Sequence, residues 1–177
     1  MSDASDTPLH VPDFALSASV RRAIVADAAA LAALVNQAYA VEHFFVDGDR
    51  TNAAEIEQMM TKGTFLVLDH HAHVGAAVYV TIERTSAYFG MLAVGPELQG
   101  RGLGKRLVRI AEAMAEAAGC AVMTMKIVNL REELGRWYRS LGYREVSTAP
   151  YTHRPIKQAC HFVEMEHPLG VRAVLAA

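Results

Sequence analysis

Cysteine is scarce in this chain: among 177 residues there are only two, Cys120 and Cys160. Two cysteines are too few for a disulfide framework, and both lie within apolar stretches, away from any spacing typical of metal ligands. Their scarcity excludes a disulfide-stabilised secreted domain and a zinc site built on cysteine. It favours a reduced protein of the cytoplasm.

Long hydrophobic runs are also missing. The longest strongly apolar stretch, Ala28 to Val35, has eight residues, whereas a membrane-spanning helix needs about 20. The first eighteen residues contain three aspartates and two prolines, and they lack the basic start and apolar block of a secretory signal. We therefore expect no membrane partner, a flexible N-terminal tail at residues 1–18 and a single domain at residues 19–177.

Neither sign of charge dominates. The 17 Lys and Arg residues stand against 19 Asp and Glu residues, which gives a net charge of -2 at pH 7. Binding to the phosphates of a nucleic acid through bulk charge requires a basic surplus, so we expect no nucleic-acid partner. Because 52% of the residues are hydrophobic, the chain can bury enough apolar surface to form one compact core.

The spacing of apolar residues and turn formers predicts elements in the order βα(α)βββαβαββ, an α+β or α/β mixture with a mixed sheet. The three central strands follow one another closely, which is typical of an antiparallel meander. The expected strands are Ser19–Val25, Thr64–Asp69, Val74–Glu83, Tyr88–Val94, Ala121–Val128, Tyr143–Ser147 and His161–Glu166. The first helix is expected after an N-cap at Asp27. Three more are expected at about Asn52–Thr61, from Leu103 to Ala118 and at about Arg131–Leu141.

The most informative segment is the glycine-rich turn Gln99–Gly104, which joins a predicted strand to a predicted helix. Glycines let backbone N–H groups approach an anion closely, and the start of a helix adds the equivalent of roughly half a positive charge. The basic residues around it are Arg101, Lys105, Arg106 and Arg109. The segment therefore predicts a phosphate-binding loop, with a plain strand-to-helix turn as the alternative.

The spacing of the glycines limits which phosphate-bearing ligands fit this turn. A dinucleotide fingerprint needs Gly-x-Gly-x-x-Gly, but Lys105 occupies the third glycine position and no acidic residue stands about 20 residues further on. A P-loop needs Gly-x-x-x-x-Gly-Lys-Ser/Thr, and here Gln99 and Arg106 replace the first glycine and the hydroxyl residue. The turn therefore predicts neither a dinucleotide nor a nucleoside triphosphate.

Two motifs resemble the GNAT superfamily of N-acetyltransferases. The segment Gln99-Gly-Arg-Gly-Leu-Gly104, after Leu92-Ala-Val94, is similar to the Q/R-x-x-G-x-G/A pyrophosphate loop of that superfamily. Asn129 after a strand, followed by Trp137-Tyr138-Arg-Ser-Leu-Gly142-Tyr143, resembles its asparagine and its Y-x-x-x-G-F/Y helix end. The resemblance covers about Ser19 to Leu169 and implies a GNAT-like fold, with a central mixed, mostly antiparallel sheet flanked by helices.

The resemblance also implies acetyl-coenzyme A as the acetyl donor, without a metal. In the family pattern, backbone amides from Gln99 to Lys105 bind the pyrophosphate, and the strand edge Leu92–Val94 pairs with the pantetheine arm. The Leu92 N–H group polarises the thioester carbonyl, and Asn129 binds the arm from the opposite strand. The coenzyme-binding residues implied in this way are Leu92, Ala93, Val94, Gln99, Gly100, Arg101, Gly102, Leu103, Gly104, Lys105, Asn129 and Tyr138.

Acetyl transfer requires a neutral amine and an acid for the departing thiolate. Tyr138 matches the family's acid, and its reference pKa of about 10 lies close to the ~8.5 of a thiol, although a core aromatic is the alternative. The usual base position falls on the stretch Tyr88–Gly90, which has neither carboxylate nor histidine. The candidate bases that remain are Glu83, Glu42, His153 and His161.

Two aromatic regions are expected to select the acceptor amine: the loop Glu42–Arg50 and the segment Thr148–Cys160. Core packing is the alternative for the two phenylalanines of the loop. The histidines at positions 70, 71 and 73 share a tight turn, which is more typical of a solvated turn than of a metal site. The predicted substrate residues are Glu42, Phe44, Phe45, Tyr88 and Tyr151.

Two functions follow from these residues. The first is an acetyl-coenzyme A-dependent N-acetyltransferase that acts on a primary amine of a small molecule or peptide by direct attack in a ternary complex, since neither cysteine lies in a motif that favours an acetyl-enzyme. The second is a non-catalytic module that senses an acyl-coenzyme A. Tyr138 and the intact glycine-rich turn favour the enzyme. The C-terminal strands also offer an edge through which a homodimer could form.

Overall fold

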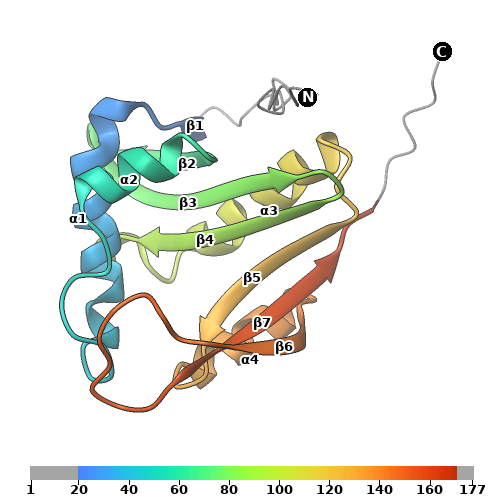
Figure 1. Ribbon diagram of the computed structural model, residues 1–177. Coiled ribbons are helices and arrows are strands. Elements are labelled where there is room, and N and C mark those ends of the chain that lie inside the picture. The colour runs from blue at the N-terminus through green and yellow to red at the C-terminus, as the bar shows by residue number, and fades with distance from the viewer. Residues whose placement is uncertain (1–19, 171–177) are drawn as a thin grey trace, which may run out of the picture.

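The protein, seen in a computed structural model, is described over residues 20–170, so the tail predicted at residues 1–18 lies outside the described residues. Seven strands form one sheet in the order β1-β2-β3-β4-β5-β7-β6, and helices cover both faces (Figure 1). The strands are β1 (Val20–Arg22), β2 (Thr64–His70), β3 (His73–Glu83), β4 (Ser86–Val94), β5 (Val122–Val128), β6 (Arg144–Pro150) and β7 (His161–Pro168). The α-helices are α1 (Ala28–Tyr39), α2 (Ala53–Met60), α3 (Leu103–Ala117) and α4 (Glu132–Ser140), and short 3-10 turns are η1 (Val25–Asp27), η2 (Ala40–Glu42) and η3 (Pro96–Leu98).

The predicted fold class and order of elements are confirmed. Neighbouring strands of the sheet pair antiparallel, except that β4 and β5 pair in parallel. A parallel pair needs a crossover connection, which α3 supplies between these two strands. The sheet is therefore mixed and mostly antiparallel, and its single parallel pair among the described strands lies at its centre.

The centre of the sheet is buried on both faces, and successive residues of a strand point to opposite sides. In β2, Leu66 and Leu68 pack into one cluster with α3 and α4, whereas Phe65 and Val67 pack into another with α1 and α2. All four side chains are buried. This two-sided burial explains the continuous apolar run of β2, and it places α1 and α2 on one face and α3 and α4 on the other (Figure 1).

The helix starts show one cap that the sequence analysis did not name and one wrong cap prediction. Asn52 caps α2, because its side-chain oxygen accepts a hydrogen bond from the Glu55 N–H group at 3.0 Å. Asp27 precedes α1 without capping it, since its carboxylate binds Arg21 and the Ile24 N–H group instead. The same contacts belong to the turn η1, so the first strand ends at Arg22 and does not continue to Val25.

Strand β6 forms one edge of the sheet, and its residues are mostly exposed. An edge strand carries backbone groups that can pair with another chain. The sequence left the oligomeric state open and pointed only to an edge at the C-terminal strands, which in this fold is β6.

Candidate active site

Strands β4 and β5 lie side by side only at their beginnings. Their pairing runs from Ser86 opposite Val122 to Tyr88 opposite Thr124. Beyond Tyr88 the two strands separate, β4 staying with β3 and β5 with β7, as Figure 1 shows. Backbone groups on the two facing edges are thereby released from the sheet and become available to a ligand.

A β-bulge distorts β4 within this opening. The register with β3 shifts so that Met91 and Leu92 stand opposite the single residue Val78. Met91 adopts a φ of +50°, which is uncommon for a residue other than glycine. Because a bulge leaves its extra residue outside the hydrogen-bond ladder, it presents the backbone near Leu92 to the opening.

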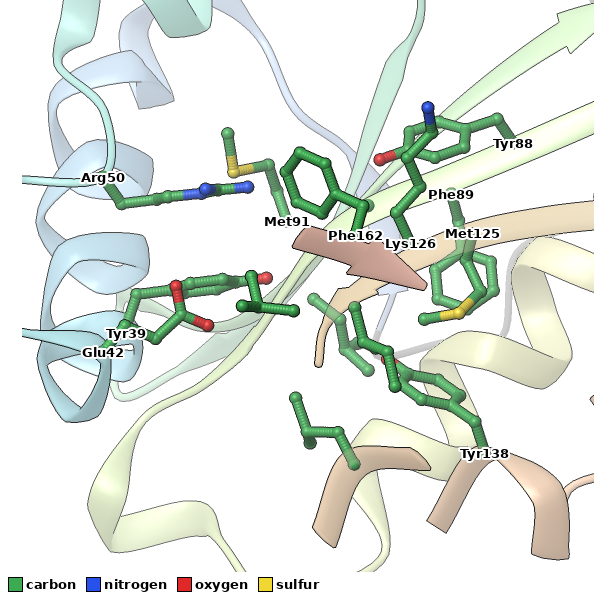
Figure 2. Close-up of a pocket in the computed structure, with 15 residues that line it drawn as sticks. Tyr39, Glu42, Arg50, Tyr88, Phe89, Met91, Met125, Lys126, Tyr138 and Phe162 are labelled. Atoms are coloured by element: carbon green, nitrogen blue, oxygen red, sulfur yellow. The ribbon is translucent and has the colours of Figure 1, made fainter. Parts of the chain in front are cut away.

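A narrow inner cavity of about 50 Å³ lies between the separated strands. Residues of β4 and β5 form its walls, and side chains from α1, η2 and α4 close it. Figure 2 shows Arg50, Tyr39 and Glu42 entering from one side and Tyr138 from α4. The polar side chains that line it include Tyr39, Glu42, Arg50, Tyr88, Lys126 and Tyr138.

Tyr138 lies on the buried face of α4 and is 4% exposed. Its ring packs against those of Phe89, Trp137 and Tyr143, with centroid distances of 5.9, 4.7 and 5.8 Å. Burial raises the pKa of its phenol well above the ordinary value. The hydroxyl group therefore keeps its proton at neutral pH and can donate a hydrogen bond into the inner cavity.

Glu42 is a buried carboxylate at the end of η2, 6% exposed. Arg131 Nη1 lies 3.2 Å from its Oε1 atom, and the same arginine also binds Glu133. Burial raises the pKa of Glu42, against the opposing charges of Arg50 and Arg131. A carboxylate that borders a cavity and has a raised pKa is well suited to accept a proton.

A larger outer cavity of about 420 Å³ adjoins the inner one. Helix α2 and the connection between β6 and β7 form its outer wall, through Glu55, Met59, His153 and Arg154. The volume is within the range of pockets that hold small molecules. The residues common to both cavities are Arg50, Tyr88, Gly90 and Met91.

The outer cavity depends on two segments that lie far apart in the sequence. The Asp47 N–H group donates to the Pro155 carbonyl at 3.0 Å, and the Lys157 N–H group donates to the Phe45 carbonyl at 2.8 Å. Arg154 Nη2 binds both carboxylate oxygens of Glu55, at 2.8 and 2.7 Å. These contacts bring together the two segments that the sequence suggests for acceptor selection.

The predicted acceptor residues take different positions. Tyr88 lines both cavities, and the hydroxyl group of Tyr151 accepts a hydrogen bond from Arg50 Nη1 at 3.3 Å. Phe44 is 55% exposed, whereas Phe45 is fully buried in a small cluster under the loop. Neither phenylalanine lines the inner or the outer cavity. Core packing, the alternative for these two residues, describes Phe45 in this fold.

The glycine-rich turn follows β4 and leads into α3. Gly100 and Gly102 have φ values of +73° and +75°, which favour glycine. A Cβ atom at either position would meet no heavy atom within 4 Å, so their backbone faces open space. A hollow of about 310 Å³, bordered by Val94 and Trp137, lies beside the turn. The arrangement lets an anion approach backbone amides at a helix start.

The basic residues near the turn are not equivalent. Lys105 borders the hollow, and Arg101 is exposed on the turn itself. Arg109 is paired with Glu112 at 2.8 Å, so much of its charge is already compensated. Arg101 and Lys105 therefore offer a phosphate a more direct attraction than Arg109 does.

Asn129 directly follows β5 and is tied to β7. Its side-chain oxygen accepts a hydrogen bond from the His161 N–H group at 2.8 Å, and its own N–H group donates to the His161 carbonyl at 3.0 Å. Because the oxygen accepts this hydrogen bond, the side-chain nitrogen is the group of Asn129 that can donate to a ligand.

The structure separates the four candidate bases. Glu83 and His161 are exposed and line neither cavity. His153 lines the outer cavity, and its pKa is lowered by burial and by the charges of Arg50 and its neighbours. Glu42 lines the inner cavity. Only these last two lie where they could accept a proton from a bound amine.

Sequence reasoning did not single out several polar residues of the site, among them Tyr39, Arg50 and Arg131. Tyr39 ends α1, and burial raises its pKa to about 12. Arg131 follows Asn129 by two positions, which is the one signal that could have indicated it. The other two stand in no motif, and only the fold brings them to the cavity.

The described residues contain no group of three or more His, Cys, Asp or Glu side chains placed to hold a metal ion. Within the same range, no helix has the length and apolarity that crossing a membrane requires.

Residues 61–145 match the family model of the acetyltransferase (GNAT) domain. A comparison with curated proteins gives no match. Among solved structures, the ribosomal-protein-S18-alanine N-acetyltransferase from Escherichia coli has a TM-score of 0.70 at 15% identity, over 90% of this chain and 98% of that one. The structure of yncA from Salmonella typhimurium with its cofactor acetyl-CoA has a TM-score of 0.67 at 24% identity, over 90% and 98%. The ribosomal-protein-alanine N-acetyltransferase from Brucella melitensis has a TM-score of 0.69 at 20% identity, over 85% and 99%.

Proposed function

Because this chain belongs to the GNAT superfamily of acetyltransferases, we propose that it binds acetyl-coenzyme A and transfers the acetyl group to a primary amine by direct attack. The observation that carries the proposal is the opening between β4 and β5. There the bulge at Leu92, the phenol of Tyr138 and the carboxylate of Glu42 border one cavity. The solved structure of yncA contains acetyl-CoA in the same fold, which supports the choice of donor.

The donor's pyrophosphate would lie on the backbone amides from Gln99 to Lys105. The fit is supported by the uncovered backbone of Gly100 and Gly102 and by the helix start at Leu103. The edge Leu92–Val94, released from pairing with β5, would hydrogen-bond the amides of the pantetheine arm. The side-chain nitrogen of Asn129 would contact the arm from the opposite strand.

The Leu92 N–H group would donate to the thioester carbonyl oxygen. Negative charge develops on this oxygen during attack, and a fixed donor in a cavity with little water stabilises it strongly. The bulge supports this role, because it turns the backbone at Met91 and Leu92 out of the regular ladder.

Glu42 would act as the base for the acceptor's ammonium group, and Tyr138 would act as the acid for the departing thiolate. An alkyl ammonium group has a pKa of about 10.4, so Glu42 takes its proton, directly or through water. The neutral nitrogen then attacks the carbonyl carbon and the C–N bond forms. The attached nitrogen releases its second proton to water as the C–S bond breaks. The sulfur leaves with the bonding electron pair and accepts the hydroxyl proton of Tyr138, which solvent later replaces.

The acceptor would occupy the outer cavity, with its amine directed towards the inner one. Tyr88 lines both cavities and would contact the acceptor near the amine. Tyr151 and the phenylalanines Phe44 and Phe45 would shape the two segments, residues 42–50 and 148–160, that contribute Arg50, His153 and Arg154 to the outer cavity. Their effect on the acceptor would then come through the position of the loop.

Two measurements test the proposal. Calorimetric titration of the protein with acetyl-coenzyme A should show binding at a single site, and free thiol should appear when small amines, amino acids and peptides with a free N-terminus are added. Absence of coenzyme binding would contradict the proposal. Coenzyme binding without thiol release for any amine would favour the sensor module over the enzyme.

A further inference from the structure

We propose that the acceptor is a small amine that carries a carboxylate or a comparable oxyanion close to its amino group, and that Arg50 binds the anionic group. This inference rests on the acetyl transfer proposed above, because it names the class of acceptor for the same site. It starts from a guanidinium group that borders both cavities and has no carboxylate partner.

Arg50 is held mainly by aromatic groups. Its guanidinium carbon lies 5.3 Å from the ring centre of Tyr39, and its Nη1 atom donates to the Tyr151 hydroxyl group at 3.3 Å. Its Nε atom is buried and has no hydrogen-bond partner among the residues that the structure describes. None of the ion pairs within residues 20–170 includes Arg50.

The other cations at the site already have acidic partners. Arg154, which lines the outer cavity, binds Glu55 through two oxygens. Lys126, which lines the inner cavity, lies 2.7 Å from a carboxylate oxygen of Glu164. Arg131 forms an ion pair with Glu42. Arg50 is therefore the cation of the two cavities that has no described carboxylate within ion-pair distance, although its charge also acts on Glu42.

The position of Arg50 is fixed in advance of binding. Arg154 donates from Nη2 to the Arg50 carbonyl at 3.3 Å and from Nε to the Asp49 carbonyl at 3.0 Å. Removing a cation from water without a counter-ion costs free energy, which an incoming anion would recover. A planar guanidinium group also binds an oxyanion through two parallel hydrogen bonds, so it selects for carboxylate-like geometry.

The anionic group and the reacting amine must lie close together. Figure 2 shows Arg50, Tyr39 and Glu42 entering the inner cavity from the same side. Arg50 shares both cavities with Met91, which directly precedes Leu92 at the bulge. A molecule with an oxyanion at Arg50 and an ammonium group at Glu42 would satisfy both charges. A polycation would instead be repelled by the positive charge of Arg50.

Matched pairs of acceptors test this inference. The common L-amino acids and their carboxamides differ in the charge of the carboxyl end and keep the same amine side. For the preferred amino acid, kcat/KM should exceed that of its amide by roughly 10²-fold, mainly through KM, because charge-assisted hydrogen bonds to the carboxylate are lost in the amide. Calorimetry of the protein–coenzyme A complex with the same pairs gives a second readout that does not need turnover.

Variants of Arg50 assign the preference to this side chain. Arg50→Gln should abolish the preference for the acid over the amide, and Arg50→Lys should retain part of it, while coenzyme affinity stays unchanged. Arg136→Gln is the matched control, because Arg136 is an exposed arginine of α4, paired with Glu132 and outside both cavities. The control should keep the wild-type preference.

The outcomes separate this inference from the proposed function. Equal activity on acids and amides, a preference for polyamines, or an acid preference that survives in Arg50→Gln would overturn the anion site and leave acetyl transfer standing. If no amine releases thiol but amino acids bind the coenzyme complex in an Arg50-dependent way, the anion site stands and the transfer fails. If no amine is acetylated and no acid binds, both the anion site and the proposed acetyl transfer are overturned.

Discussion

The rings of Tyr138 and Tyr143 lie 5.8 Å apart at their centroids, yet their hydroxyl groups have different surroundings. The Tyr143 hydroxyl donates to Glu112 Oε1 at 2.9 Å in the core. Tyr138 lines the inner cavity between β4 and β5. Two buried phenols of the same cluster thus provide an internal comparison, in which one supports the fold and the other is proposed to take part in the chemistry.

Tyr138→Phe keeps the ring and removes only the hydroxyl group, so packing is preserved. If the phenol supplies the proton for the departing thiolate, kcat should fall by roughly 10²-fold, with little change in coenzyme affinity or thermal stability. Steady-state kinetics at saturating acetyl-coenzyme A measure this. Wild-type turnover in the variant would remove Tyr138 from the mechanism.

Tyr143→Phe is the matched control for the same cluster. Glu112 stays buried with Arg109 as its remaining partner, so unfolding free energy should fall by about 1–3 kcal/mol while kcat stays close to the wild-type value. Chemical denaturation and the same kinetic assay give the two numbers. A loss of turnover as large as that of Tyr138→Phe would indicate that the cluster acts through packing alone.

Glu42→Gln should remove the acidic limb of the pH profile. The proposed base works only when ionised, so wild-type kcat/KM should rise with pH through the pKa of Glu42, which burial raises above its ordinary value. In the variant the rate should be lower and nearly independent of pH in that range. Glu133→Gln is the control, because Glu133 shares Arg131 but is exposed. A limb that persists in Glu42→Gln and disappears in His153→Asn would assign the base to His153.

Gly102→Glu should weaken coenzyme binding by about tenfold or more, because it places a side chain and a negative charge where the pyrophosphate is proposed to lie. Gly119→Glu is a matched control. Gly119 has a φ of +83° and open space around its Cβ position, but it lies at the other end of α3. Both variants carry similar backbone strain, so only a specific loss of coenzyme affinity in Gly102→Glu supports the loop. Equal losses in calorimetry would attribute the effect to strain.

Phe45→Ala should destabilise the protein by about 3–5 kcal/mol, since Phe45 is fully buried beneath the loop that borders the outer cavity. Loosening this loop should also raise KM for the acceptor and leave coenzyme affinity nearly unchanged. Phe44→Ala, at an exposed neighbour, should cost little stability. Thermal unfolding and acceptor kinetics check both variants. A collapse of coenzyme affinity with unchanged acceptor kinetics would contradict the assignment of this loop to the acceptor.

Much of the fold could be predicted from local patterns. The apolar run Phe65–Leu68, the cap at Asn52 and the glycines at positions 100 and 102 each depend on groups within a few residues. Asp27 shows where such reasoning fails: it has the residue type of a cap, but Arg21 and Asp69 form a charged cluster that engages its carboxylate instead. A competing partner brought by the fold outweighed the local preference.

In the candidate site, too, some residues could be predicted from local motifs and others only from the fold. The glycine-rich turn and Tyr138 were found from motifs, because their chemistry requires particular residues at fixed spacing. The bulge at Met91 and Leu92 has no such pattern, since it arises from the register between two strands. The sequence also grouped Phe44 with Phe45, and only the loop's packing against Val128 and Phe162 separates an exposed ring from a buried one.

The sequence by itself determined the class of fold, the order of its elements and the position of the glycine-rich turn, because hydrophobic period and glycine conformations act over short stretches of chain. Only the tertiary structure decided which charges meet. Glu42 lies against Arg131, 89 residues away, and Arg50 is brought to a cavity without a carboxylate of its own. Burial and pairing set the free energy of a charged group, and both depend on neighbours that the folded chain supplies from distant positions.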